Sequence, residues 1–173
     1  VSTITGVNGE TGATVGTVDV SNTTHTNAGT YSSDTWSFTG TANYNNIAAT
    51  TITDKIDKAN ATFTVTPYTV TYDGNPHTAT VSTITGVNGE TGATVGTVTL
   101  NTTHTNVGTY SSDTWSFTGT ANYNNIAATT ITDKIDKANA TIVVTPYSVN
   151  YDSFAHAATG TAKGVLGESL SGL

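Results

Sequence analysis

The chain contains no cysteine, arginine, glutamine or methionine, and only three prolines among 173 residues. Without cysteine there are no disulfides and no thiolate metal sites. Twelve acidic residues against five lysines give a net charge of −7, which would repel nucleic acid and anionic membrane surfaces. No apolar run approaches the roughly 20 residues that span a bilayer. We therefore expect no nucleic-acid partner and no membrane insertion in this fragment, and the absence of methionine predicts that it is part of a longer protein.

Threonine is the most prominent residue and makes up about a quarter of the chain, accompanied by valine, isoleucine and tyrosine. These β-branched and aromatic side chains suit a pleated, half-buried surface. Helix formers are scarce, with only three glutamates and five lysines. The composition predicts an all-β chain. The low charge and the richness in Thr, Asn, Ser and Gly favour an extracellular location.

Internal repetition is the strongest signal in the sequence. The segment Val1–Val18 recurs unchanged at Val81–Val98, an offset of 80 residues. After the loss of one residue, Gly29–Thr62 recurs unchanged at Gly108–Thr141, an offset of 79 residues. A third copy begins near Ala138 and diverges before the chain ends. A period near 79 residues is too long for one rung of a solenoid and too short for two domains. One small β-sandwich per period is the natural unit.

Two charged segments with the sequence DKIDKA set the expected phase of the repeat. They lie at Asp54–Ala59 and Asp133–Ala138 and hold four of the five lysines. Solvated segments of alternating charge suit a junction between domains. We therefore expect residues 1–57 to be the rear part of a repeat that lacks its first strands, 58–136 to be a complete repeat, and 137–173 to be the front part of the next. The candidate junction residues are Asp54, Lys55, Ile56, Asp57, Lys58, Asp133, Lys134, Ile135, Asp136 and Lys137.

The start of the complete repeat shows a change of period-2 phase at Pro67. Apolar residues at Phe63 and Val65 share one parity, whereas those in Tyr68–Tyr72 take the other. Proline lacks a ladder N–H, so the strand should bend there and present its second half to the opposite side. Further strands are expected, separated by Gly and Asn turns, at His77–Ile84, Ala93–Leu100, Thr109–Thr118 and Ile126–Ile135. Six or seven short strands per period predict an immunoglobulin-like β-sandwich.

Several strings in each period resemble a known family. VTPYTVTYDGNPHTAT, NTTHTNVGTYSSDTWSFTG, ANYNN and DKIDKANAT are similar to the tandem immunoglobulin-like repeats of large bacterial surface proteins and adhesins, of the MBG or YDG type. The resemblance covers essentially the whole chain. It implies a secreted or surface-anchored stalk without catalytic residues. The third copy departs from the pattern, because YDSFAH replaces YDGNPH and loses both turn-favouring pairs.

No catalytic motif appears, and we expect no enzyme activity. Each complete period has two histidines without metal-ligand spacing, and no nucleophile motif is present. No cofactor is expected; calcium at the module junctions, held by pairs such as Asp54 and Asp57, stays open although no calcium-loop pattern occurs. A Lys to Asn cross-link also stays open. The indoles of Trp36 and Trp115 alternate with serine in W-S-F, which favours core positions, and they are the candidate glycan contacts if exposed.

Two functions of different classes follow from these observations. In the first, the chain is a structural spacer whose partners are neighbouring repeats of the same or identical chains, with the two partial repeats completing one sandwich head to tail. In the second, each module binds a glycan or protein weakly and repetition supplies avidity. The sequence identifies no host or matrix ligand.

Overall fold

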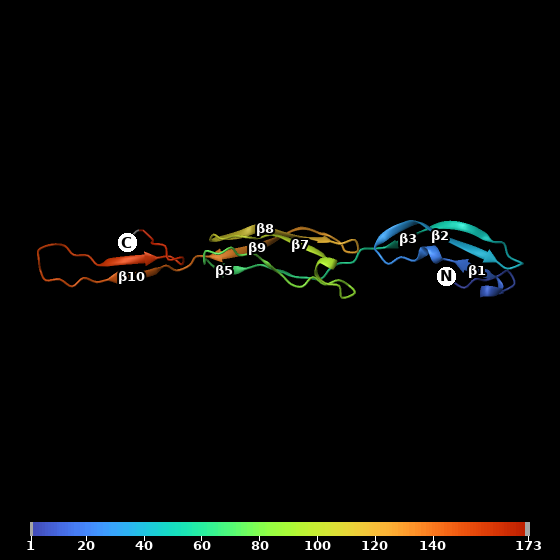
Figure 1. Cartoon of the computed structure of the whole chain (residues 1–173), viewed down its shortest axis with the longest axis horizontal. Coiled ribbons are helices and arrows are strands. Elements are labelled where there is room, and N and C mark those ends of the chain that lie inside the picture. Colours follow the sequence, from blue (N-terminus) through green and yellow to red (C-terminus); the bar gives the residue numbers. More distant parts are fainter. Residues whose placement is uncertain (1, 172–173) are drawn as a thin grey trace. The chain divides into compact units, whose positions relative to one another are not determined.

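The computed structural model describes residues 2–171, and its regular secondary structure consists almost entirely of β-strands (Figure 1). The β-rich fold that the composition predicts is confirmed. In the described residues the only helical elements are three 3-10 turns of three residues each. The chain divides into two compact units: the first runs up to Asn60 and includes Gly119–Asn124, and the second contains Ala61–Thr118 and the residues from Asn125 on.

The first unit is built on one antiparallel sheet in the order β1-β2-β3. Its elements are η1 (Gly12–Thr14), β1 (Gly16–Asp19), η2 (Ser21–Thr23), β2 (Gly29–Gly40) and β3 (Ile47–Ile56). The long hairpin β2–β3 pairs Asp34 with Ile52 and has two register shifts, which are sites of locally increased twist.

The second unit contains three separate sheets, of which the largest has four strands in the order β5-β9-β8-β7. Strand β5 runs parallel to β9, and β8 runs antiparallel to it. Two small antiparallel sheets pair β4 with β6 and β10 with β11. The elements are β4 (Val65–Thr66), β5 (Thr69–Thr71), β6 (Thr80–Val81), η3 (Gly92–Thr94), β7 (Gly96–Asn101), β8 (Gly108–Gly119), β9 (Ile126–Asp136), β10 (Thr141–Thr145) and β11 (Thr159–Lys163).

The change of phase at Pro67 is confirmed as a change of sheet. Before the proline, Val65 pairs with Val81 in the β4–β6 sheet. After it, Val70 pairs with Ile135 in the four-stranded sheet. Because Pro67 has no N–H to give to a ladder, the chain can leave one sheet there without breaking a hydrogen bond.

The strand expected at His77–Ile84 is much shorter in the structure, where only Thr80–Val81 forms β6. A side chain takes the place of one of the expected backbone hydrogen bonds between strands. Thr102 Oγ1 accepts a hydrogen bond from the Ala79 N–H at 3.1 Å, and its own residue is completely buried. His77 still contributes a single antiparallel bridge to His104.

The hydrophobic core of the second unit centres on Phe117, which is 1% exposed. The ring of Phe63 packs against it with centroids 4.9 Å apart and meets Trp115 edge-on at 5.6 Å. Gly96 lies against the Phe117 ring so closely that a Cβ there would collide with the ring and with the Thr118 carbonyl. Glycine is therefore required at this position by close approach.

The turn of the third copy keeps its geometry although its sequence diverges. Asp73 Oδ1 accepts the Asn75 N–H at 2.9 Å, and Asp152 Oδ1 accepts the Phe154 N–H at 3.0 Å. Ser153 adopts φ 68° where the second copy has Gly74 at 82°. The aspartate side chain thus preserves the turn without the Gly and Pro that the sequence pattern favours.

Candidate functional site

The two DKIDKA segments lie at the ends of β3 and β9 rather than wholly between strands. Asp54–Ile56 belongs to β3 and Asp133–Asp136 to β9, and only Asp57–Ala59 and Lys137–Ala138 follow the strands. Within each segment a lysine pairs with the aspartate two residues on: Lys55 Nζ–Asp57 Oδ1 is 2.6 Å and Lys134 Nζ–Asp136 Oδ1 is 2.7 Å. These pairs are exposed, so each contributes little to stability.

Asp133 is the exception among these charged residues, because it is 0% exposed. Its Oδ1 accepts the Tyr68 N–H at 2.8 Å, while its Oδ2 is buried and makes no hydrogen bond within the described part of the chain. Burial raises the pKa of Asp133, and the neighbouring Asp113 carboxyl raises this pKa further, whereas the Tyr68 amide and the charge of His104 act to lower it.

A histidine and a tyrosine complete this cluster in the complete repeat. His104 Nε2 lies 2.8 Å and 2.9 Å from the two carboxylate oxygens of Asp113, and its ring stacks on Tyr110 with centroids 3.5 Å apart. The first unit repeats the arrangement, with His25 Nε2 2.7 Å from Asp34 Oδ2 and the His25 ring 3.4 Å from that of Tyr31. Each of these two histidines thus contacts an aspartate carboxylate and stacks on a tyrosine ring, which indicates a structural role.

A second set of contacts, which the sequence did not reveal, lies in the first unit around Lys58–Asn60. The loop Asn122–Asn124, called here the Asn-Tyr-Asn loop, docks on this segment through the backbone of Ala59. The Ala59 N–H donates to the Asn122 carbonyl, and the Asn124 N–H donates to the Ala59 carbonyl, both at 2.9 Å. Asn122 Oδ1 also accepts the Ala28 N–H at 2.8 Å, and Asn124 Nδ2 donates to Asn60 Oδ1 at 2.8 Å. The only available signal was the repeated string ANYNN, which reads as a turn.

Tyr44, the counterpart of the tyrosine in this loop, binds the hairpin turn Gly6–Glu10. Its hydroxyl donates to Glu10 Oε2 at 3.1 Å and accepts the Val7 N–H at 3.2 Å. Gly6 leaves the space that the phenol oxygen fills, since a Cβ there would overlap it. The turn Gly6–Glu10, with the sequence GVNGE, therefore forms a binding site, called here a receptor, for a tyrosine side chain.

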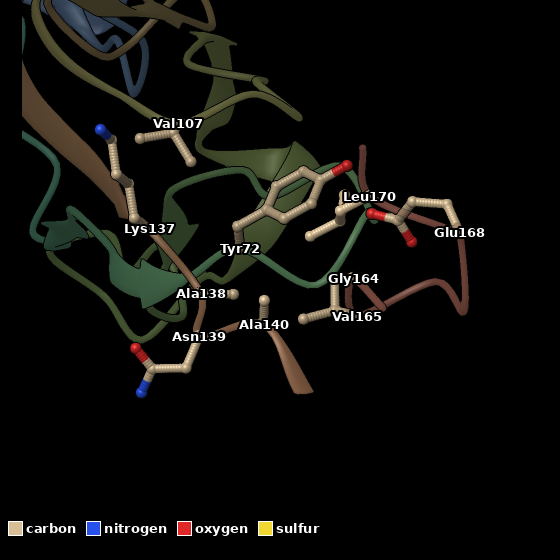
Figure 2. Close-up of a pocket in the computed structure, with 10 residues that line it drawn as sticks. All are labelled: Tyr72, Val107, Lys137, Ala138, Asn139, Ala140, Gly164, Val165, Glu168 and Leu170. Atoms are coloured by element: carbon tan, nitrogen blue, oxygen red, sulfur yellow. The ribbon is translucent and has the colours of Figure 1, made fainter. Parts of the chain in front are cut away.

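The second unit contains an open hollow of about 220 Å³ next to the second junction segment. Figure 2 shows Lys137 and Val107 at one end of the group, Glu168 and Leu170 at the other, and Tyr72 between them. The remaining lining residues are Ala138, Asn139, Ala140, Gly164 and Val165. The hollow is mainly apolar and has one lysine and one glutamate at its rim.

The two candidate glycan contacts are half-buried in the structure. Trp115 is covered on one side by Phe63. Trp36 instead lines an apolar hollow of about 310 Å³ together with Phe38 and Tyr44. The indoles are therefore partly accessible, and their role as sugar contacts stays a prediction.

No cation site or membrane-spanning helix is found in residues 2–171. Nowhere in that range do three or more His, Asp or Glu side chains gather in a way that could hold a metal ion. Calcium at the junctions accordingly stays an untested prediction. None of the helical turns in this range is long and apolar enough to cross a membrane.

Comparison with known proteins identifies no relative of the chain. No protein-family model, curated protein or solved structure matches the chain. The similarity to bacterial surface repeats thus rests on the motifs alone.

Proposed function

We propose that the chain is part of a structural stalk of a bacterial extracellular surface protein, built from tandem immunoglobulin-like β-sandwich modules, without catalytic activity or a bound cofactor. The observation that carries this proposal is the recurrence of one hairpin: Asp34 pairs with Ile52 in β2–β3, and Asp113 pairs with Ile131 in β8–β9, with register shifts at the same places. Identical modules present identical surfaces and no specialised site, which suits a spacer that supplies length.

The two-sheet arrangement around Pro67 supports the sandwich part of this proposal. The segment before the proline belongs to one sheet and the segment after it to another, with Phe63, Trp115 and Phe117 packed together. Two sheets whose inner faces share an aromatic core are the basis of a β-sandwich.

A length measurement tests the stalk. Additional copies of residues 58–136 are inserted after Asp136, and the maximum dimension is measured by small-angle X-ray scattering. A rigid stalk gains the same increment with each inserted repeat, whereas a flexible linker of equal length grows roughly as the square root of its length. Growth no faster than that of a Gly-Ser insertion control would overturn the proposal. Labelling of intact and of permeabilised source cells with an antibody tests the surface location.

We further propose that partial repeats complete one another head to tail by strand addition. In the complete repeat, β5 covers the edge of β9 in parallel. In the first unit, β3 has β2 as its only strand neighbour among the described residues. The counterpart of β5 in the third copy lies in Tyr147–Tyr151, outside any strand, and all three of its apolar residues are exposed. An open sheet edge and a segment outside any sheet with a similar sequence to the covering strand are the components that strand addition requires.

Weak glycan or protein binding with avidity is the second candidate function. The half-exposed Trp36 beside an apolar hollow favours it. A glycan array with the wild-type chain and with Trp36→Ala decides between the two. Binding that the substitution abolishes supports a lectin-like module, and a blank array supports the spacer.

A further inference from the structure

The hollow in Figure 2 combines, in one place, the counterparts of two receptors that are occupied elsewhere in the chain. The first receptor is the segment Lys58–Asn60, on which the Asn-Tyr-Asn loop docks. The second is the turn Gly6–Glu10, which holds Tyr44. Both receptors hold their ligands in the structure, so the chain itself shows what these surfaces bind.

The segment Lys137–Asn139 repeats the first receptor letter for letter. Ala138 stands where Ala59 receives the loop, and Val107 stands where Ala28 donates its N–H to Asn122. Within residues 2–171, the backbone amides of Ala138 and Val107 make no hydrogen bond, whereas both counterparts are engaged. Two backbone donors that have acceptors in the first receptor thus have none in its copy within residues 2–171.

The turn Gly164–Glu168 repeats the second receptor with the string GVLGE. Its Gly164 N–H donates to the Glu168 carbonyl at 2.9 Å, as Gly6 does to Glu10 at 2.7 Å. Its third residue, Leu166, donates its N–H to Glu168 Oε2 at 2.9 Å, as Asn8 does to Glu10 Oε2 at 2.9 Å. The turn is thus formed, and the carboxylate of Glu168 lies nearest to Gly164, at the position that the Tyr44 hydroxyl takes beside Gly6.

We propose that this hollow binds the loop Asn43–Asn45 of a second copy of the chain, with Tyr44 of that copy lying against Gly164 and Glu168. Asn43 and Asn45 are exposed and have the same letters as Asn122 and Asn124. The loop would place its first asparagine on the Val107 and Ala138 amides and its tyrosine hydroxyl on Glu168 and the Val165 N–H. The inference rests on the proposed head-to-tail assembly and names the surfaces that meet.

Docking requires an exchange of hairpins, because Tyr44 already binds Glu10 of its own chain. The GVLGE turn of one copy would displace the GVNGE turn of the next, so the new contacts largely replace equivalent old ones. Only the hydrogen bonds of the asparagines are gained outright. Because part of the binding free energy is spent on this opening, we expect weak association, with a Kd of roughly 10 μM to 1 mM.

Sedimentation equilibrium of the 173-residue chain over a wide concentration range tests the inference. The wild type should form concentration-dependent oligomers. The matched pair Glu10→Ala and Glu168→Ala should act in opposite directions, because the first substitution loosens the hairpin to be displaced and the second removes the incoming acceptor. We expect association severalfold tighter for Glu10→Ala and about tenfold weaker for Glu168→Ala.

A second pair controls for folding. Asn43→Ala should weaken association about tenfold, while its counterpart Asn122→Ala, already engaged within one chain, should leave association unchanged. Circular dichroism of all four variants verifies that the strands are retained. A chain that is monomeric at every concentration, or oligomers indifferent to Glu168→Ala and Asn43→Ala, would overturn the docking. Neither outcome affects the stalk, which the scattering increments judge separately.

Discussion

Strands β3 and β9 have the same sequence from Ile47 to Ile56 and from Ile126 to Ile135, and they differ in what covers them. Ile56 is 37% exposed, whereas Ile135 is 1% exposed. The difference comes from β5, which pairs with β9 in parallel and brings Val70 opposite Ile135. Identical side chains thus lie at an open sheet edge in one copy and in the core of the other, because among residues 2–171 a short strand covers β9 but not β3.

The same contrast holds for the aromatic residues on β2 and β8. Phe38 is half-buried beside an apolar hollow, while Phe117 is buried under the ring of Phe63. The residues of Ala61–Tyr72 therefore convert a sheet with an open face into a closed core.

Truncating the two phenylalanines should separate the copies most clearly. Phe117→Ala leaves a cavity in a packed core and should lower the free energy of unfolding by about 3 to 5 kcal/mol. Phe38→Ala removes a ring that is already half exposed and should cost about 1 to 2 kcal/mol. Urea unfolding followed by tryptophan fluorescence measures both. Equal losses in the two variants would mean that Phe63 does not close the core.

The buried carboxyl of Asp133 should reverse the usual pH dependence of an aspartate. Because its pKa is raised in the folded chain, its contribution to stability is complete below the ordinary value of 3.8 and is lost as the pH rises through the folded-state pKa. Asp133→Asn stays neutral, so its stability relative to wild type should improve by about 1 kcal/mol or more between pH 4 and pH 7. Chemical unfolding at a series of pH values checks this expectation. The half-buried counterpart gives the control, and an equal response of Asp54→Asn would contradict the role of burial.

Asp73 should show the opposite sign and a smaller effect. The Asn75 N–H, the Asn75 side chain and His77 lower its pKa from 3.8 to about 2. Its contribution is therefore present above pH 4 and is lost as the pH falls from about 4 through about 2. Asp73→Asn can still accept the turn hydrogen bond but does not titrate, so its thermal midpoint should depend less on pH in this window. An unchanged slope would show that the carboxylate does not contribute through its charge.

The exposed lysine pairs should give the smallest effect. Lys134→Ala removes the contact with Asp136, which is 2.7 Å long and open to solvent. We expect a change within about 0.5 kcal/mol, reduced further by salt, and the same for Lys55→Ala. Thermal unfolding at low and high ionic strength measures both. A loss above 1 kcal/mol, on the order of a buried pair, would place these lysines in a packed interface.

Much of the local structure could be predicted from particular residues. The phase change around Pro67 predicted a change of direction, and the structure has a change of sheet there. The Gly and Asn turns around Thr109–Thr118 predicted β8 to within a residue of each end. Where side chains take the place of backbone ladder bonds, as Thr102 does for Ala79, the sequence pattern overestimated the strand.

The candidate site could be predicted less well, because its parts are distant in sequence. The DKIDKA segments were predicted to be solvated throughout, yet Asp133 is fully buried. The docking of Asn122 on Ala28 joins residues 94 positions apart, and no local pattern encodes it. The sequence ANYNN by itself predicts only a turn. That this loop binds the segment Lys58–Asn60 is visible only in the tertiary structure.

The sequence by itself determined the β-rich class and the repeat, because residue type and an exact recurrence of letters depend on no contact. Only the tertiary structure decided which copy of a residue is buried, since burial depends on what lies opposite rather than on the residue. Asp54 and Asp133 are the same letter in the same string, and one is half exposed while the other shares a buried cluster with Asp113 and His104. The physical reason is that desolvation is a property of the surroundings, and here those surroundings are supplied by residues on other strands.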